Sequence, residues 1–294
     1  MLGEVLTAMV TPFRPDGGID LDRFRALARH LLDNGSDGLV VAGTTGESPT
    51  LTDDERFALF ETAVDEVSGR ATVVAGTGTY DTRHSVHLTE RAHSLGVDGF
   101  LVVTPYYNLP PPRGIVAHFR AIAEASDRPI VVYNIPQRVV RNIEPETICE
   151  LADIPSVRAV KQATTDLDQA RRILAETDLD LYAGNDDLVL PFLELGGVGG
   201  VCVHTHLVGT QVKEMIRRFR EGDAERARAI DQELRPIVAA LAVTTNPIPV
   251  KAALNLLGHE VGGLRLPLVD ATEPEREAVR AALERAGLLA AATV

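Results

Sequence analysis

The sequence predicts an α/β fold, a (β/α)8 TIM barrel with additional C-terminal helices. Two observations carry this prediction. Short apolar runs alternate with amphipathic segments from the N-terminus to about residue 221, and eight such runs occur. Each run is apolar on both faces, which is typical of a parallel strand covered by helices. The runs lie at residues 6–9, 38–41, 72–76, 99–103, 130–133, 157–161, 181–184 and 200–203.

The predicted helices have recognisable beginnings and ends. Asp20 stands directly before one amphipathic segment, and Thr52 stands before the acidic start of another. A side-chain oxygen at such a position caps free N–H groups, and acids favour the first helical turn. A faint internal repeat places Gly35, Gly96 and Gly197 between a helix and the next strand. Glycine there fits a left-handed helix stop.

A doubly wound open sheet is the alternative, because it shows the same alternation of strands and helices. Such a sheet usually has fewer strands and carries a dinucleotide-binding fingerprint. Gly76-Thr77-Gly78 follows a predicted strand, but Asp81 stands where the fingerprint requires its third glycine. The sequence therefore favours the barrel.

The strand pattern stops near residue 222, and we expect two regions. Residues 1–222 form the catalytic barrel domain, and residues 223–294 form a C-terminal helical extension. The extension should contain helices at 224–243, 248–257 and 273–288, with Asn246-Pro247-Ile248-Pro249 separating the first two. We expect this layer to be available for an oligomer interface.

The bulk properties point to small-molecule chemistry in the cytoplasm. The formal net charge of -13 disfavours a nucleic-acid or anionic membrane surface. The only two cysteines, Cys149 and Cys202, lie far apart without metal-type spacing, which suits a reducing compartment. No apolar run approaches the roughly 20 residues of a membrane span, and no basic leader is seen.

Lysine is rare in this chain, with three residues against 26 arginines, so Lys161 at the end of an apolar run needs an explanation. A lysine amine condenses with a ketone to form a protonated imine, whereas a guanidinium cannot. Lys161 is therefore the first candidate for covalent chemistry, although a lysine at a strand end can also simply pair with a carboxylate. We expect Lys213, beside Glu214, to be a surface charge and Lys251 to be structural.

Other polar residues follow predicted strands, where the active site of a βα barrel forms. Gly43-Thr44-Thr45-Gly46-Glu47-Ser48 lacks the P-loop ending and suits a backbone cradle for a carboxylate, or is an ordinary glycine-rich turn. Tyr133 ends the strand before that of Lys161, and its phenol can pass a proton through a hydroxyl such as Thr44. Arg138 in the next loop can clamp a substrate carboxylate, or face solvent.

A metal-dependent mechanism is the rival to an imine, because zinc also stabilises an enolate. His84 and His87 are one helical turn apart, and His204 and His206 could point both rings one way from a strand end. No third ligand is obviously placed with either pair, so the sequence favours no metal.

Five motifs resemble the pyruvate-dependent class I aldolases of the dihydrodipicolinate synthase and N-acetylneuraminate lyase family. The resemblance covers nearly the whole chain, in order and spacing. It implies a (β/α)8 barrel with C-terminal helices, a tetramer built from tight dimers, and no organic cofactor. The motifs are Met9-Val10-Thr11-Pro12-Phe13, Gly43-Thr44-Thr45-Gly46-Glu47-Ser48, Val103-Thr104-Pro105-Tyr106-Tyr107-Asn108, Tyr133-Asn134-Ile135-Pro136 and Val160-Lys161.

The resemblance also implies a role for each matching residue. Lys161 would form the Schiff base with pyruvate, and Thr45 with the backbone of Thr44 would hold its carboxylate. Tyr133, Thr44 and Tyr107 would form a proton relay, with Tyr107 reaching in from a neighbouring subunit. The backbones of Gly184 and Val201 would line the pyruvate pocket.

An arginine at the position of Arg138 resembles the synthase branch of the family, where it binds the carboxylate of aspartate semialdehyde. The implied reaction condenses pyruvate with L-aspartate 4-semialdehyde to give 4-hydroxy-tetrahydrodipicolinate, on the route to diaminopimelate and lysine. The alternatives are a sibling aldolase, either N-acetylneuraminate lyase or one acting on a 2-keto-3-deoxy sugar acid, and a catalytically silent ligand-binding barrel.

Several positions depart from the family pattern. Val139-Val140-Arg141 replaces the familiar Thr-Gly, and His204 and His206 replace a threonine and an asparagine after the last strand. Inhibition by lysine is doubtful. The positions that differ from the usual effector site are Tyr80, Asp53, Arg56 and His84.

Overall fold

The computed structural model describes residues 2–67 and 69–290, and its centre is a closed parallel barrel. The strands pair in chain order, and the last pairs with the first. This confirms the predicted fold class. The eight strands are β1 (Val5–Ala8), β2 (Gly38–Val41), β3 (Thr72–Gly76), β4 (Gly99–Val103), β5 (Ile130–Asn134), β6 (Val157–Gln162), β7 (Asp180–Ala183) and β8 (Gly199–Cys202).

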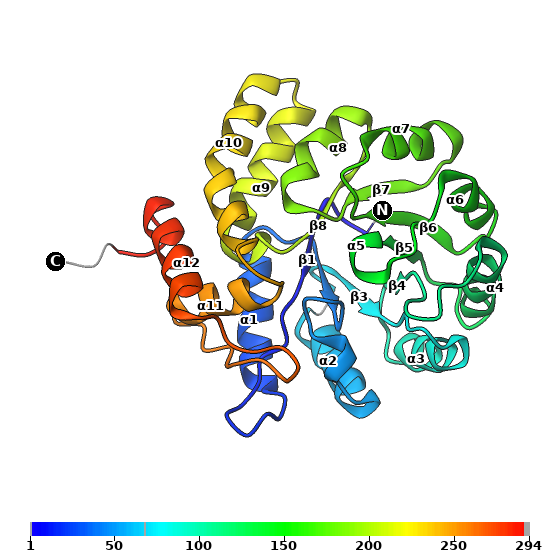
Figure 1. Cartoon of the computed structure of the whole chain (residues 1–294), viewed down its shortest axis with the longest axis horizontal. Helices are drawn as coiled ribbons and strands as arrows, with labels where there is room; N and C mark the ends of the chain where they lie inside the picture. The colour runs from blue at the N-terminus through cyan, green and yellow to red at the C-terminus, as the bar shows by residue number, and fades with distance from the viewer. Residues whose placement is uncertain (1, 68, 291–294) are drawn as a thin grey trace.

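Helices surround the barrel, as Figure 1 shows. They are α1 (Leu21–Asp33), α2 (Asp53–Val67), α3 (Thr82–Ser94), α4 (Pro112–Ala123), α5 (Pro136–Val139), α6 (Pro145–Ala152), α7 (Leu167–Glu176), α8 (Val189–Leu195) and α9 (Thr205–Arg220). Two short 3-10 turns, η1 (Ser48–Thr50) and η2 (Asp186–Leu188), follow β2 and β7. The Asp20 side chain caps α1 by accepting from the N–H of Arg23, as the sequence predicts.

The strand bounds agree with the sequence to within one or two residues. The helix α5 was not predicted, because its single turn is too short for an amphipathic period to be visible. Pro136 occupies its first turn, where a missing N–H costs nothing. This turn follows Tyr133 and contains Arg138, and so it determines where the arginine side chain lies.

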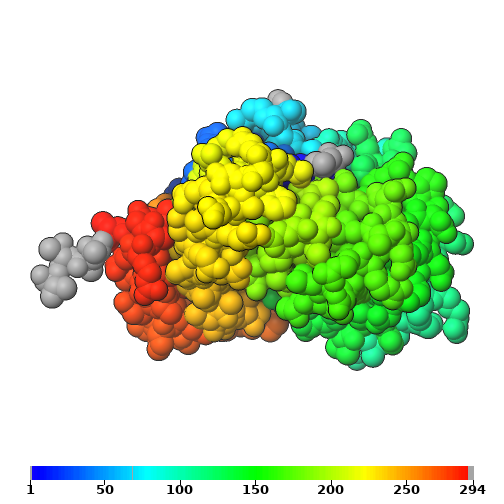
Figure 2. All heavy atoms as spheres, turned by 90° about the horizontal axis from the view of Figure 1, so that it is seen from above, coloured from blue at the N-terminus to red at the C-terminus, as the bar shows by residue number. Residues whose placement is uncertain are grey.

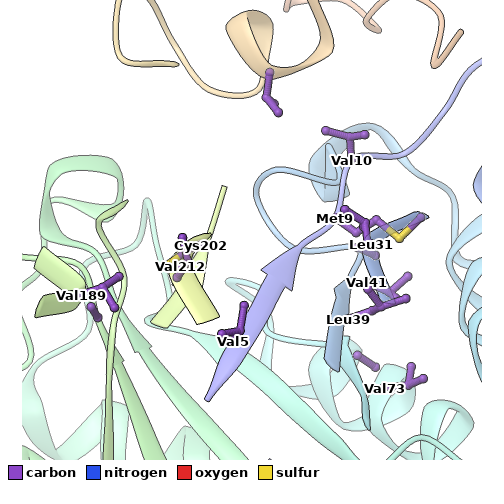
Figure 3. Packing of buried hydrophobic residues seen from close by; sticks show 14 of the residues in the cluster. Val5, Met9, Val10, Leu31, Leu39, Val41, Val73, Val189, Cys202 and Val212 are labelled. Atoms are coloured by element: carbon purple, nitrogen blue, oxygen red, sulfur yellow. The ribbon is translucent and has the colours of Figure 1, made fainter. Parts of the chain in front are cut away.

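Alternating side chains of each strand form two separate apolar layers. Leu6 and Val40 belong to the cluster inside the barrel, whereas Val5 and Leu39 belong to the cluster between strands and helices. Figure 3 shows part of that outer layer around β1 and β2. The period of two continues along β6, so Lys161 points the same way as Ala159, into the barrel.

The three helices α10 (Ala224–Leu241), α11 (Ile248–Leu256) and α12 (Glu273–Arg285) follow the barrel. They lie to one side of it, beside α1 and α9 (Figures 1 and 2). Ile230, Leu254 and Leu283 are buried in the same apolar cluster as the outer faces of the strands. Within residues 2–67 and 69–290, no helix has the length and apolar character needed to cross a membrane.

Candidate active site

Lys161 and Tyr133 face each other inside the barrel mouth. They are Cα partners in the parallel pair of β5 and β6, and Lys161 Nζ lies 4.2 Å from the centroid of the phenol ring. Lys161 is 5% exposed and Tyr133 is 4% exposed. The amine is therefore largely withdrawn from bulk water and lies against an aromatic face.

A cavity of about 680 Å³ opens above this pair, at the C-terminal ends of the strands. Its wall combines loops of the barrel with α10 and the segment that follows α10. The predicted site residues that line it are Thr44, Thr45, Tyr133, Arg138, Lys161 and Gly184. The sequence did not point to Asn185, Asp186, Asp187, Arg235 or Asn246, which line it too.

Two predicted residues do not line this cavity. The side chain of Val201 is buried in the apolar cluster inside the barrel that also contains Tyr133, and Val201 pairs with Leu6 on β1. Tyr107 is 92% exposed and has a φ of 67°, in the left-handed region that few non-glycine residues adopt. The cavity of a single chain is therefore formed without Tyr107.

The turn after β2 presents Thr44 and Thr45 to the cavity. It is closed by hydrogen bonds from the N–H of Glu47 to the carbonyl of Thr44 at 3.1 Å and from the N–H of Ser48 to that of Gly43 at 3.2 Å. Neither bond uses the N–H groups of Thr44 and Thr45. Thr45 is buried, and its hydroxyl accepts from Asn246 Nδ2 at 3.0 Å.

Gly184 is required by close packing at the end of β7. Its N–H donates to the carbonyl of Gln162 at 2.8 Å. A Cβ added at Gly184 would lie 2.7 Å from the Cβ of Ala163. A side chain there would displace the chain directly after Lys161, so only glycine leaves that part of the cavity open.

Arg138 lies at the rim of the cavity, on the short helix α5. Its Nη2 donates to the backbone carbonyl of Asn246 at 3.1 Å, and the residue is otherwise exposed. This single neutral partner leaves the guanidinium charge available to a carboxylate in the cavity.

Asp186, which lines the cavity, lies against the buried side chain of His204. Asp186 Oδ1 is 3.1 Å from His204 Nδ1, and the carboxylate accepts from the N–H groups of Val203 and His204, each at 2.8 Å. Burial opposes ionisation, but the charge and hydrogen bond of His204 and these N–H groups lower the pKa of Asp186 to about 2. Asp186 is therefore an anion at neutral pH, and its carboxylate is already bound by His204 and by these two N–H groups.

The sequence suggested that the two histidines after β8 could point at one site. In the structure they contact different groups. His206 Nε2 accepts from the N–H of Val10 at 3.2 Å, and its Nδ1 lies 2.8 Å from the carbonyl of Val203. Burial lowers the pKa of His206 to about 4, so the ring is neutral and serves both backbone groups. His204 instead lies within 4.8 Å of ligand atoms of Asp186 and Cys202.

The four residues that differ from the usual effector site form two groups. His84 Nε2 is 2.9 Å from Asp53 Oδ1, and Arg56 is buried with its Nη2 on the carbonyl of Ser48 at 2.6 Å. Tyr80 is 56% exposed and meets Tyr106 edge-on at 5.3 Å. The expectation against feedback inhibition by lysine stays a prediction, which adding lysine to an assay tests.

Comparison with known proteins agrees with this geometry. The sequence matches the model of the Dihydrodipicolinate synthetase family over residues 1–286. The 4-hydroxy-tetrahydrodipicolinate synthase of Moorella thermoacetica is 51% identical over 98% of this chain and 99% of its own. That of Bacillus subtilis is 49% identical over 93% of this chain and 96% of its own.

Solved structures of the same kind superpose closely. DHDPS from Cyanidioschyzon merolae with lysine bound has a TM-score of 0.96 and 45% identity, covering 98% of this chain and 99% of that one. Dihydrodipicolinate synthase from Thermotoga maritima has a TM-score of 0.95 and 42% identity, covering 98% of this chain and 100% of that one. The resemblance predicted from the motifs is thus confirmed: the chain belongs to the dihydrodipicolinate synthetase family of class I aldolases.

Proposed function

We propose that this chain condenses pyruvate with L-aspartate 4-semialdehyde through a Schiff base on Lys161, giving 4-hydroxy-tetrahydrodipicolinate. One observation carries the proposal. A buried lysine amine lies 4.2 Å from the ring of Tyr133 in a cavity that is also lined by Thr44, Thr45 and Arg138. The names of relatives at about half identity support the choice of this reaction.

In the first half-reaction, Lys161 Nζ attacks the ketone carbon of pyruvate. Loss of water leaves a protonated imine, which draws electrons from the neighbouring methyl group. The hydroxyl of Thr45 and the N–H groups of the turn donate to the pyruvate carboxylate. Loss of a methyl proton then gives the enamine nucleophile.

In the second half-reaction, the enamine carbon attacks the aldehyde carbon and a carbon–carbon bond forms. Tyr133 takes up the methyl proton while its own phenolic proton passes to Thr44, and the relay then runs in reverse to give a proton to the new alkoxide. The amine of the acceptor attacks the imine carbon, which closes the ring and releases Lys161.

Arg138 selects the acceptor. Its guanidinium has no carboxylate partner within the described part of the chain and stands at the cavity rim. A carboxylate on the aldehyde gives this charge a bidentate partner, whereas a polyhydroxylated aldehyde without a carboxylate does not.

We also propose a homotetramer made of two tight dimers, in which the partner subunit's Tyr107 completes the proton relay. Tyr107, Leu109 and Val140 are exposed apolar residues, and all three have left-handed backbones. Such strain persists where surrounding structure holds it, and a second subunit can supply that structure. One solved relative, at 42% identity, is described as a monomeric variant, and sedimentation of this chain distinguishes the two states. The two free cysteines suit a cytoplasmic enzyme.

Borohydride reduction in the presence of pyruvate tests the covalent step, because it fixes the imine as a stable adduct. Mass spectrometry of peptides should find the adduct on Lys161, and an unlabelled Lys161 would overturn the proposal. Assays that offer aspartate semialdehyde, N-acetylmannosamine and glyceraldehyde in parallel then identify the acceptor. Preference for an aldehyde without a carboxylate would assign the chain to a sibling aldolase.

A further inference from the structure

The C-terminal extension contacts the proposed pyruvate-binding turn at three points. We infer that the segment from Asn246 to Arg265 holds Thr44 and Thr45 in their carboxylate-binding arrangement, with Asn246 and the Glu47–Lys251 ion pair as positioning residues. The inference rests on the proposed function, because it concerns how pyruvate is held.

Asn246 fixes the direction of the Thr45 hydroxyl. Its Nδ2 donates to Thr45 Oγ1 at 3.0 Å, so the oxygen acts as an acceptor there. The hydroxyl has one proton, which remains free to be donated to another partner. Both residues line the cavity, so an anion in the cavity is the natural acceptor of that proton.

Asn246 also connects the two proposed carboxylate sites. Its backbone carbonyl accepts from Arg138 Nη2 at 3.1 Å, while its side chain contacts Thr45. One residue of the extension therefore contacts both the residue that would bind pyruvate and the residue that would bind the acceptor.

A second contact lies behind the turn. Glu47 Oε1 is 2.6 Å from Lys251 Nζ, and the two side chains are 0% and 1% exposed. Lys251 also donates to the carbonyl of Gly263 at 2.7 Å and lies 4.2 Å from the centroid of the Phe13 ring. Burial lowers the pKa of Lys251 and the charge of Glu47 opposes the shift. Each charge needs the other, because an unpaired charge at such depth is strongly destabilising.

The backbone of Glu47 explains why this pair can set the turn. Glu47 has a φ of 56°, in the left-handed region, and its N–H closes the turn onto the carbonyl of Thr44. A residue with a side chain stays in that region only when its surroundings hold it there. The ion pair to Lys251 supplies such a restraint, two residues after Thr45.

Arg265 provides the third contact. Its backbone N–H donates to Glu47 Oε2 at 3.0 Å, and its Nη1 donates to the carbonyl of Thr50 at 2.7 Å. Its guanidinium also pairs with Glu55 at the start of α2. The extension thus contacts the chain on both sides of η1, in addition to the contacts from the barrel region, where Thr11 Oγ1 donates to the carbonyl of Gly46 at 2.7 Å and Arg56 donates to that of Ser48.

The sharpest test compares Asn246→Asp with Asn246→Ala. The aspartate keeps the shape but replaces the N–H donor by an acceptor, so the Thr45 hydroxyl would turn to it and away from pyruvate. We expect the pyruvate concentration for half-maximal borohydride trapping to rise about tenfold in Asn246→Ala and further in Asn246→Asp. Asn246 is only half-buried, so both variants should fold.

The ion pair is tested by Lys251→Met and by the double variant Glu47→Gln with Lys251→Met. The double variant leaves no unpaired buried charge, so its melting temperature should lie above that of Lys251→Met. If the ion pair positions the turn, the double variant should still need about tenfold more pyruvate than the wild type. Lys213→Met, which breaks an exposed pair with Asp37, is the matched control and should change neither measurement.

The outcomes separate this inference from the proposed function. Failure to trap pyruvate on wild-type Lys161 would overturn the Schiff-base assignment and this inference with it. A different result would overturn only the positioning role. In that result the wild type is trapped normally, and folded Asn246→Asp and the double variant reach half-maximal trapping at pyruvate concentrations within about twofold of the wild type.

Discussion

Lys161 and Tyr133 are partners across β5 and β6, and the lysine amine lies 4.2 Å above the phenol ring. Because parallel strands place partner side chains on the same face, the amine and the phenol reach the cavity together. Replacing one of them should therefore affect a different step from replacing the other.

Replacement of Lys161 by arginine should abolish catalysis. The arginine is also a long basic side chain, but a guanidinium cannot form the imine. We expect turnover to fall to the background of the assay and no pyruvate to be trapped by borohydride. Lys213→Arg, on the surface of α9, is the matched control. Residual trapping at another lysine would show that Lys161 is not the nucleophile.

Tyr133→Phe should slow the chemistry without preventing capture of pyruvate. The variant keeps the ring under Lys161 Nζ and removes only the hydroxyl, so we expect kcat to fall about 10²- to 10⁴-fold. Trapping with borohydride at long times should still label Lys161. A kcat near the wild-type value would exclude Tyr133 from proton transfer.

Arg138→Gln should weaken binding of the acceptor and leave pyruvate binding unchanged. The variant removes the guanidinium charge together with its hydrogen bond to the carbonyl of Asn246. Loss of a charge-assisted contact should raise KM for aspartate semialdehyde by about 10- to 100-fold. Arg171→Gln, on exposed α7, serves as the control. An equal rise in KM for pyruvate would mean that Arg138 acts through the turn at Thr45.

Mixed oligomers can reveal whether Tyr107 acts across an interface. Tyr107→Phe and Lys161→Arg should each be nearly inactive alone. If Tyr107 serves the partner's site, subunits of the two variants mixed under dissociating conditions should regain about a quarter of wild-type activity, by the arithmetic of random pairing in a closed dimer. A mixture that stays inactive, or an enzyme that sediments as an active monomer, would contradict the arrangement.

Stability should fall as the pH decreases from about 6.5 to 4, in part because of His206. Its pKa is lowered to about 4 in the folded chain by burial, so the unfolded chain binds a proton first as the pH falls. The contribution of His206 to the free energy of unfolding is fully present above its pKa in the unfolded chain. It is lost as the pH falls toward its pKa in the folded chain, at up to about 1.4 kcal/mol per pH unit. Urea unfolding of His206→Asn should show a correspondingly flatter dependence between these pH values. An unchanged slope would contradict the assignment.

Much of the fold could be predicted because its signals are local. Each strand is a short run that is apolar on both faces, and the count of eight separates a closed barrel from an open sheet. The sequence likewise predicted which residues meet, because all parallel strands end at one rim. The signals were the motif from Gly43 to Ser48 and the strand-end positions of Tyr133 and Lys161. Helix α5 was not predicted, because a helix of one turn is too short to show an amphipathic period.

The sequence by itself determined the barrel and the residues that meet at the rim, because periodicity and strand order are properties of neighbouring residues. Its motifs resembled the family that the comparisons confirm. Only the tertiary structure decided that Asn246 contacts Thr45, that Lys251 pairs with Glu47, and that the two histidines after β8 serve different partners. These contacts join residues far apart in the chain, and they depend on which buried charges and hydrogen-bonding groups find a partner once the helices have packed.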